Sequence, residues 1–526
     1  MSLPSLPPSC TALKGLSVTT DESTLTEGVR PSTTTGENEQ LPAGAVSGLG
    51  VFAQGLAAAA PSVAIAAVPG SLFLIAGKGA FWAAIIGGTL VYLIAALIAF
   101  QARRTVSSGS LGTYAGNGLG PGAAFVTGWA LILGYIGFAA GGVLGAVLYF
   151  NAFLQEIGLP TDHLAVKVLL LILASAAAFY LPFRGVSVSV KLGLGFEIVS
   201  LVAIFVILIA SYLHYGAHLD ANQFSLSHLG ASTTLIAAVT AVGSYAGFES
   251  AASLGHEARD AHRSVPRAVL RLVVILSALY LFATYPEVLG FQGPKTLDAD
   301  STPLPVVAEN AGVHWVTYIV TLSLGTAMIV FSAAVINSGA RSLFTLAREH
   351  ALPSSLGRVH SAFRTPHVAI ALVSVVGFII GLIGTVNSVG RFQWDVYVGI
   401  VSSYAYLFAY LLVAIATPLW LRKIKALTRG SVAVAVLAAL GILFVIYKNL
   451  VPVPAGAYKY LPYVFLALLL VGLLRFLQLR ATKPEVAARV GSIQTLSDAE
   501  QERLAELGIL DAVHGSHRAQ RAVDGI

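Results

Sequence analysis

The sequence predicts an all-α protein that crosses a membrane many times. Hydrophobic residues make up 56% of the 526 residues, charged residues only 11%, and the mean hydropathy is +0.80. A chain of this composition is too apolar for soluble domains. Its apolar runs are unbroken and approach the roughly 20 residues that a spanning helix needs, whereas the strands of an outer-membrane barrel alternate in polarity. The spans are therefore expected to be helices.

Twelve apolar segments, bounded by charged or Pro/Gly-rich stretches, predict twelve membrane-spanning helices. Six of them lie in the first half of the chain, near residues 45–76, 80–102, 121–154, 165–183, 188–214 and 231–253. Six more lie near residues 267–289, 313–345, 367–387, 395–421, 431–448 and 459–479. An even number of spans places both termini on the same side of the membrane.

The 31 Lys and Arg residues are unevenly distributed between the connections. When alternate connections are assigned to opposite faces, one face collects nineteen basic residues, with Arg341, Arg348 and Arg364 expected at its surface, and the other face has six. The six are Lys78, Lys167, Lys295, Arg391, Lys448 and Lys459. Because basic loops stay in the cytoplasm, we expect a cytoplasmic, disordered arm at 1–42, a twelve-helix domain at 43–480 and a cytoplasmic tail at 481–526. The expected location is the cytoplasmic membrane.

Several classes of function are excluded by composition. The single cysteine, Cys10, allows no intramolecular disulfide and no cysteine-based metal site. The formal charge of +6 is scattered between apolar runs, so nucleic acid is not an expected partner. The chain has no nucleotide-binding loop, zinc-type His pair or nucleophile elbow, so we expect no cofactor, no metal and no enzymatic activity.

The first apolar segment contains a helix-breaking sequence. Ala59 and Ala60 are followed by Pro61 and Ser62, and the proline removes a backbone donor and can begin a new half-helix. The free amides of Ser62 and Val63 at such a helix start would suit a carboxylate or another anionic group.

The sixth apolar segment is interrupted at a matching place, within the run Gly243, Ser244, Tyr245, Ala246, Gly247. The glycines permit unwinding, and Tyr245 is a candidate gate over a ligand. Non-helical backbone in a bilayer must line a cavity or be buried in protein, so the paired breaks predict a binding site near the midplane. The alternative for each break is a kink or a close packing contact.

Two acidic residues, Glu197 and Glu249, lie deep within apolar segments, where a charge costs about 2.5 to 3.5 kcal/mol on insertion scales. Both are candidates for coupling transport to proton movement. The alternative for Glu197 is a hydrogen-bonded packing acid. The alternative for Glu249, which follows the second break, is a structural group that satisfies freed backbone donors.

Three blocks of sequence between residues 45 and 480 carry distinctive motifs. The first block contains Gly247-Phe248-Glu249, Glu257-Ala258-Arg259 and Val265-Pro266-Arg267-Ala268. The second block contains Asn337-Ser338-Gly339-Ala340-Arg341, Ala347-Arg348-Glu349-His350-Ala351-Leu352-Pro353 and Thr365-Pro366. The third block contains Thr113-Tyr114, Gly120 and Gly128-Trp129. In order and spacing, these blocks resemble the sixth-helix signature, the connection between helices eight and nine, and the second loop with the third helix of the amino acid–polyamine–organocation permeases.

This resemblance implies a five-plus-five inverted-repeat fold of the leucine-transporter type, with repeats at about 45–214 and 231–421 and two extra helices at about 431–479. It also implies that helices one and six unwind around the substrate. Glu197 stands near the position where some proton-coupled members have a lysine. The chain departs from the family pattern at the first break, which lacks the usual Gly-rich run, and at Asp260-Ala261-His262, where Asn-Pro is usual.

The expected function is secondary active transport of an amino acid or related amine, with a proton rather than sodium as the coupling ion. A non-transporting sensor on the same fold is the alternative, although the polar tails are short for a signalling domain. The identity of the substrate, the choice between symport and exchange, and the oligomeric state stay open at this point.

Overall fold

A computed structural model describes residues 41, 44–160, 163–215, 220–292, 297, 303–387, 391–453, 456–492 and 495–496. The arm predicted at 1–42 therefore lies outside the described residues except for Leu41, and so does the predicted tail beyond residue 496.

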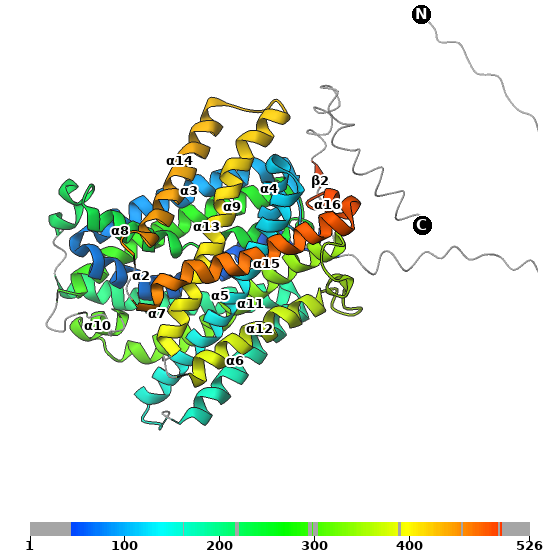
Figure 1. Ribbon diagram of the computed structural model, residues 1–526. Helices are drawn as coiled ribbons and strands as arrows, with labels where there is room; N and C mark the ends of the chain where they lie inside the picture. The colour runs from blue at the N-terminus through cyan, green and yellow to red at the C-terminus, as the bar shows by residue number, and fades with distance from the viewer. Residues whose placement is uncertain are drawn as a thin grey trace, which may run out of the picture.

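Helices make up almost all of the described chain (Figure 1). The α-helices are α1 (Gly48–Ala59), α2 (Pro61–Ala76), α3 (Ala80–Ala102), α4 (Leu111–Leu119), α5 (Pro121–Glu156), α6 (Leu164–Arg184), α7 (Val186–His214), α8 (Ser232–Gly243), α9 (Ala261–Gly290), α10 (Pro303–Asn310), α11 (Val316–Arg348), α12 (His367–Val386), α13 (Arg391–Lys423), α14 (Arg429–Leu450), α15 (Leu461–Thr482) and α16 (Pro484–Arg489). Two short strands are β1 (Thr105–Val106) and β2 (Thr495–Leu496). The short helices α4, α10 and α16 were not predicted.

Eleven helical stretches among the described residues are long and apolar enough to cross a membrane, which confirms the all-α polytopic prediction. The first stretch, Gly48–Ala102, has 55 residues and contains α1, α2 and α3. At 1.5 Å per residue it is far longer than the roughly 30 Å of a bilayer core. Twelve crossings would require this stretch to cross twice, so the number twelve stays a prediction.

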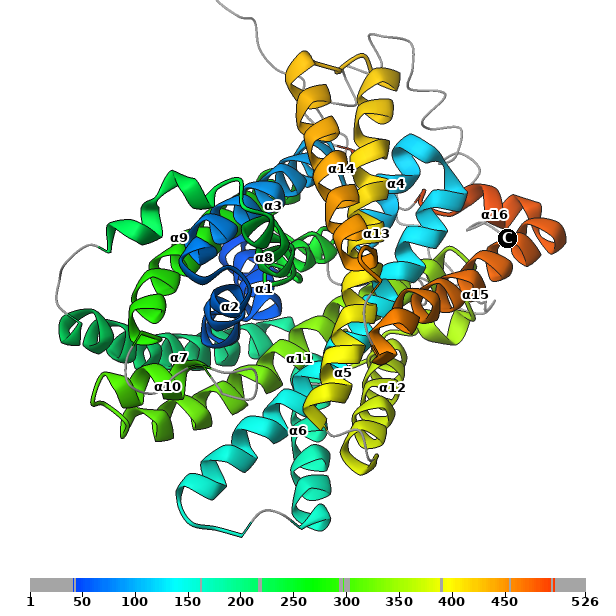
Figure 2. The ribbon, with the colours of Figure 1, turned by 60° about the vertical axis from the view of Figure 1, so that its left-hand side comes forward.

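The two halves of the first broken helix lie inside the bundle. In Figure 2, α1 and α2 are surrounded by α3, α7, α8, α9 and α11, and both halves pack against α7, α9 and α11. Helices α14 and α15 lie at the periphery, and their leucines, such as Leu437, Leu440 and Leu474, are more than half exposed. Exposed aliphatic side chains of this kind suit contact with lipid.

Four segments that are distant in sequence meet at one end of the bundle. The backbone N–H of Val46, before α1, donates to the carbonyl of Glu257 at 2.8 Å, and the N–H of Arg259 donates to the carbonyl of Val46 at 2.7 Å. Strand β1, after α3, pairs antiparallel with β2, after α16. A Cβ atom at Gly255 would lie 3.0 Å from the backbone of Ser107, so the segment before α1 and the strand after α16 lie at the same end of the bundle.

The cytoplasmic assignment of that side can be tested with Cys10, the one cysteine in the sequence. An impermeant thiol reagent should leave Cys10 unlabelled in intact cells and label it after permeabilisation. As a control, Ser227→Cys in a Cys10→Ser background should label in intact cells, because Ser227 is exposed between α7 and α8, on the opposite face. Labelling of Cys10 in intact cells would overturn the assignment.

Candidate substrate site

The first helix break lies between α1 and α2. Ala60 connects the two halves in a left-handed conformation with φ of 41°, and Pro61 begins the second half. A left-handed alanine costs about 1 to 2 kcal/mol, so the surrounding structure has to hold it in place. Ala59, Ala60, Pro61 and Ser62 are all buried.

The second break follows α8. Helix α8 ends at Gly243, the chain turns through Ser244, Tyr245 and Ala246, and Gly247 has φ of 103° before the 3-10 helix Phe248–Leu254 begins. A Cβ atom at Gly247 would lie 2.1 Å from the carbonyl oxygen of Ala58. The two breaks thus touch backbone to backbone, and only glycine permits this approach.

Glu197, on α7, binds the start of α2. Its carboxylate accepts a hydrogen bond from the backbone N–H of Ser62 at 2.7 Å and another from the Ser62 hydroxyl at 3.0 Å. This carboxylate therefore occupies the helix N-terminus that the sequence suggested as a site for an anionic ligand. The Ser62 amide is not free, because the protein supplies its own anion.

Glu249 binds the second break from within. Its carboxylate accepts hydrogen bonds from the N–H of Gly247 at 3.0 Å, from the hydroxyl of Tyr410 at 2.6 Å and from the hydroxyl of Tyr135 at 3.2 Å. Tyr135 lies on α5 and Tyr410 on α13, so this one side chain connects the break to two neighbouring helices. Three donors from three elements are typical of a carboxylate that holds structure together.

A cavity adjoins the second break on the side of α2. It lies between α2, α3, α8 and α9, and its lining residues are Val68, Pro69, Leu72, Ala84, Ala241, Ser244, Tyr245, Tyr280 and Thr284. The Tyr245 hydroxyl donates to Ser277 Oγ at 3.0 Å, and the Tyr280 hydroxyl donates to the carbonyl of Ser244 at 2.9 Å. The two rings pack edge to face at 4.9 Å. A gate at Tyr245 would therefore have to break these contacts.

A polar network that the sequence did not predict lies on the α1 side of the breaks. Arg341, expected near the cytoplasmic surface, is fully buried, and its guanidinium donates to the Glu257 carboxylate at 2.5 and 2.9 Å. Arg341 also donates to Asn337, whose side-chain amide donates to Gln54 at 2.9 Å. The network joins α1, α11 and the segment after the second break. The sequence contained one sign of this network, because Asn337 and Arg341 are four residues apart and therefore share one face of a helix.

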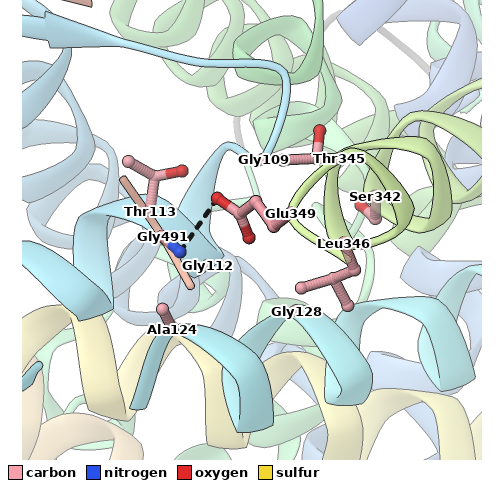
Figure 3. Close-up of a pocket in the computed structure, with 10 residues that line it drawn as sticks. All are labelled: Gly109, Gly112, Thr113, Ala124, Gly128, Ser342, Thr345, Leu346, Glu349 and Gly491. Carbon is pink, nitrogen blue, oxygen red and sulfur yellow. Dashed lines mark hydrogen bonds between the residues drawn. The ribbon is translucent and has the colours of Figure 1, made fainter. Parts of the chain in front are cut away.

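A second cavity lies nearer the end of the bundle where β1 and β2 pair. Figure 3 shows residues from α4, α5 and α11 around it, together with Glu349 and Gly491. The backbone N–H of Gly491, which follows α16, donates to the Glu349 carboxylate at 2.9 Å. The segment after the last long helix thus reaches back over this end.

The contact between the breaks can be tested at Gly247. Gly247→Val should abolish uptake and leave folded protein in the membrane, because a side chain there meets the Ala58 carbonyl and adopts a left-handed conformation costing about 1 to 2 kcal/mol. The measurement is substrate uptake normalised to the folded protein in the membrane. Gly399→Val, on α13, is the matched control, because a Cβ atom at Gly399 meets nothing within 4 Å. Unaltered uptake by Gly247→Val would rule out a substrate site at the contact between the two breaks.

The buried ion pair should matter for stability. Glu257→Gln leaves the Arg341 guanidinium buried without its counter-charge, a change that typically costs about 3 to 5 kcal/mol. We expect a clear drop in the melting temperature of the purified protein, and partial recovery in the double variant Glu257→Gln with Arg341→Met. Asp260→Asn, which removes the exposed pair with Arg263 at 4.0 Å, should change little. Equal effects of both single variants would contradict the structural role.

Comparisons with known proteins agree with this arrangement. The chain is 23% identical over 403 residues to the branched-chain amino acid permease BcaP of Bacillus subtilis, covering 72% of this chain and 83% of that protein. It is 26% identical over 293 residues to the low-affinity putrescine importer PlaP of Escherichia coli, covering 53% of this chain and 61% of the importer. It is 23% identical over 334 residues to the methylthioribose transporter of Bacillus subtilis, covering 60% of this chain and 69% of that transporter.

A family model described as amino acid permease matches residues 43–474, which is most of the chain. This match confirms the resemblance seen in the sequence motifs, and it agrees with the transporters named among the relatives. The chain is a multi-pass membrane transporter, and it belongs to the amino acid permease family.

Proposed function

We propose that this transporter moves an amino acid or a related amine across the cytoplasmic membrane by secondary active transport. The observation that carries the proposal is the contact between the two helix breaks, where Gly247 lies against the carbonyl of Ala58 inside the bundle. Unwound backbone at that depth supplies polar groups that a small substrate can bind. The relatives named for branched-chain amino acids and for putrescine fit the same substrate range.

We place the substrate beside the backbone of Ala59 to Ser62 and of Ser244 to Gly247. The cavity lined by Ser244, Tyr245 and Tyr280 adjoins this backbone and supplies aromatic surface. Alternating access then requires the helices on one side of the substrate to separate while those on the other side stay closed. Ser62 and Gly247 would have to change partners in that movement.

We propose Glu197 as the group that couples uptake to protons. Its carboxylate binds the positive end of α2 through Ser62, so the loss of its charge weakens the attraction between α7 and α2. Glu249 is the second candidate, but its three donors from the break, α5 and α13 favour a structural role. A proton is preferred to sodium because a single carboxylate carries the proposed step.

The coupling role predicts a separation between exchange and accumulation. In proteoliposomes, Glu197→Gln should retain binding and exchange of labelled substrate, because the amide oxygen can still accept from Ser62. It should lose accumulation driven by an imposed pH gradient, because a neutral amide cannot carry a proton. Amino acids and amines would be screened first by thermal stabilisation of the purified wild type.

Glu156→Gln is the matched control, because Glu156 is an acid at the far end of α5, bonded to Thr321 rather than to either break. This control should accumulate substrate like the wild type. A Glu197→Gln protein that still concentrates substrate when a pH gradient is imposed would rule Glu197 out. A wild type that moves no amino acid or amine would overturn the proposed function itself.

A further inference from the structure

The segment that follows α15 folds back onto the helical domain. Ala487 of α16 and Val490, just after it, are both buried, and they belong to the same hydrophobic core as Phe476 of α15. Phe476 packs against Phe125 of α5 with ring centroids 5.5 Å apart. The segment is therefore attached to the domain by apolar packing through α15 and α5.

Gly491 holds this segment on the α1 side of the helix breaks. Its backbone N–H donates to the carboxylate of Glu349, the residue after α11, at 2.9 Å, and it covers the small cavity between α4, α5 and α11 (Figure 3). Gly491 has φ of 83°, and a Cβ atom there would lie 2.6 Å from the Cβ atom of Ala124 on α5. A larger residue at this position would be strained and would push the segment away from α5.

Strand β2 connects the same segment to the chain that follows the second break. It pairs antiparallel with β1, so that Thr495 lies opposite Val106. Ser107, the residue after β1, lies against Gly255, because a Cβ atom at Gly255 would meet the backbone N and O atoms of Ser107 at 3.0 Å. Gly255 directly follows the 3-10 helix that begins at the second break. Strand β1 therefore lies between β2 and the backbone beyond this break.

The segment after α15 thereby joins two groups of helices. Helix α3 makes its most extensive contacts with α8 and α9, whereas α5 makes its most extensive contacts with α11 and α13 (Figure 2). Strand β1 follows α3 and belongs with the first group, which contains the second break. Ala124 lies on α5 and Glu349 follows α11, so both belong with the second group. The segment is bound to both groups at once.

We propose that residues 484–492 and 495–496 form a latch that keeps the α1 side of the transporter closed and has to release before that side opens. In alternating access, the helices that contain the breaks move against their neighbours. Such a movement has to break either the β1–β2 pairing or the contacts of Gly491. Two paired strand residues, one hydrogen bond and two small buried side chains are few enough to open without unfolding the domain.

The test measures opening of the α1 side in the purified full-length protein and needs no substrate. Ser253, in the 3-10 helix after the second break, is fully buried, and its hydroxyl donates to Ser338 of α11 at 3.2 Å. In a Cys10→Ser background, Ser253→Cys should therefore react with a maleimide only when this side opens. Ser211→Cys, at a buried position near the other end of the bundle, reports general loosening. Labelling rates at both positions are measured by mass spectrometry.

Lifting the latch should speed up labelling at position 253. Gly491→Val should raise this rate about tenfold, the size expected for a lost hydrogen bond to a charged group, and should leave the rate at position 211 unchanged. Gly456→Val is the matched control and should behave like the wild type. Gly456 also has a positive φ, of 61°, but a Cβ atom there meets nothing within 4 Å, so this variant adds strain without lifting the latch.

Locking the latch should have the opposite effect. Opposed Cα atoms in antiparallel strands are about 4.5 to 5.5 Å apart, so Val106→Cys with Thr495→Cys can form a disulfide. The oxidised protein should label at position 253 more slowly than the same protein after reduction. Equal rates in the two forms would overturn the latch, and so would a Gly491→Val protein whose labelling rises as much at position 211 as at position 253. Because no substrate is used, either result would leave the proposed function standing.

Discussion

The structure depends on how polar backbone is satisfied inside a bilayer-sized bundle of helices. Two helices are interrupted at the same depth, and each interruption exposes N–H groups that no water can reach. One carboxylate from the protein binds each of them: Glu197 binds the start of α2, and Glu249 binds the turn at Gly247. Without these acids both breaks would expose unpaired donors, and the backbone contact between Gly247 and Ala58 would lose its support.

The two acids differ in what they connect. Glu249 receives hydroxyl groups from α5 and α13, so it ties the second break to helices that form the wall of the bundle. Among the described residues, Glu197 accepts both of its hydrogen bonds from Ser62, across the boundary between α7 and α2. An acid bound to a single half-helix can alter a conformational equilibrium when its charge changes, whereas an acid bound to three elements resists movement.

The regions on the two sides of the helix breaks, towards α1 and towards α2, contain different kinds of side chain. On the α1 side, Arg341, Glu257, Asn337 and Gln54 form a closed network, and the segment after α16 adds the contact between Gly491 and Glu349. On the α2 side, a cavity is lined by Tyr245, Tyr280 and small or aliphatic side chains. The polar network therefore closes the α1 side of the breaks more firmly than the α2 side, where the cavity lies.

The sequence by itself determined the class of the protein and the places where its helices break. The thickness of the bilayer core sets the length of each spanning segment independently of the others, so the spans can be predicted from local composition. Pro61 and Gly247 impose local backbone conformations, so the breaks are also local information. Family membership followed from motifs such as Gly247-Phe248-Glu249, because those residues are contiguous in the chain.

Only the tertiary structure decided which groups meet at the breaks. The contact of Glu197 with Ser62 joins residues 135 positions apart, and the pairing of Arg341 with Glu257 joins residues 84 positions apart. A hydropathy pattern places a side chain at a depth but leaves its rotation and its neighbours undetermined. For this reason Arg341 was expected at the surface, whereas helix packing buried it. The physical reason is that burial and pairing depend on how helices pack side by side, and no single segment contains that information.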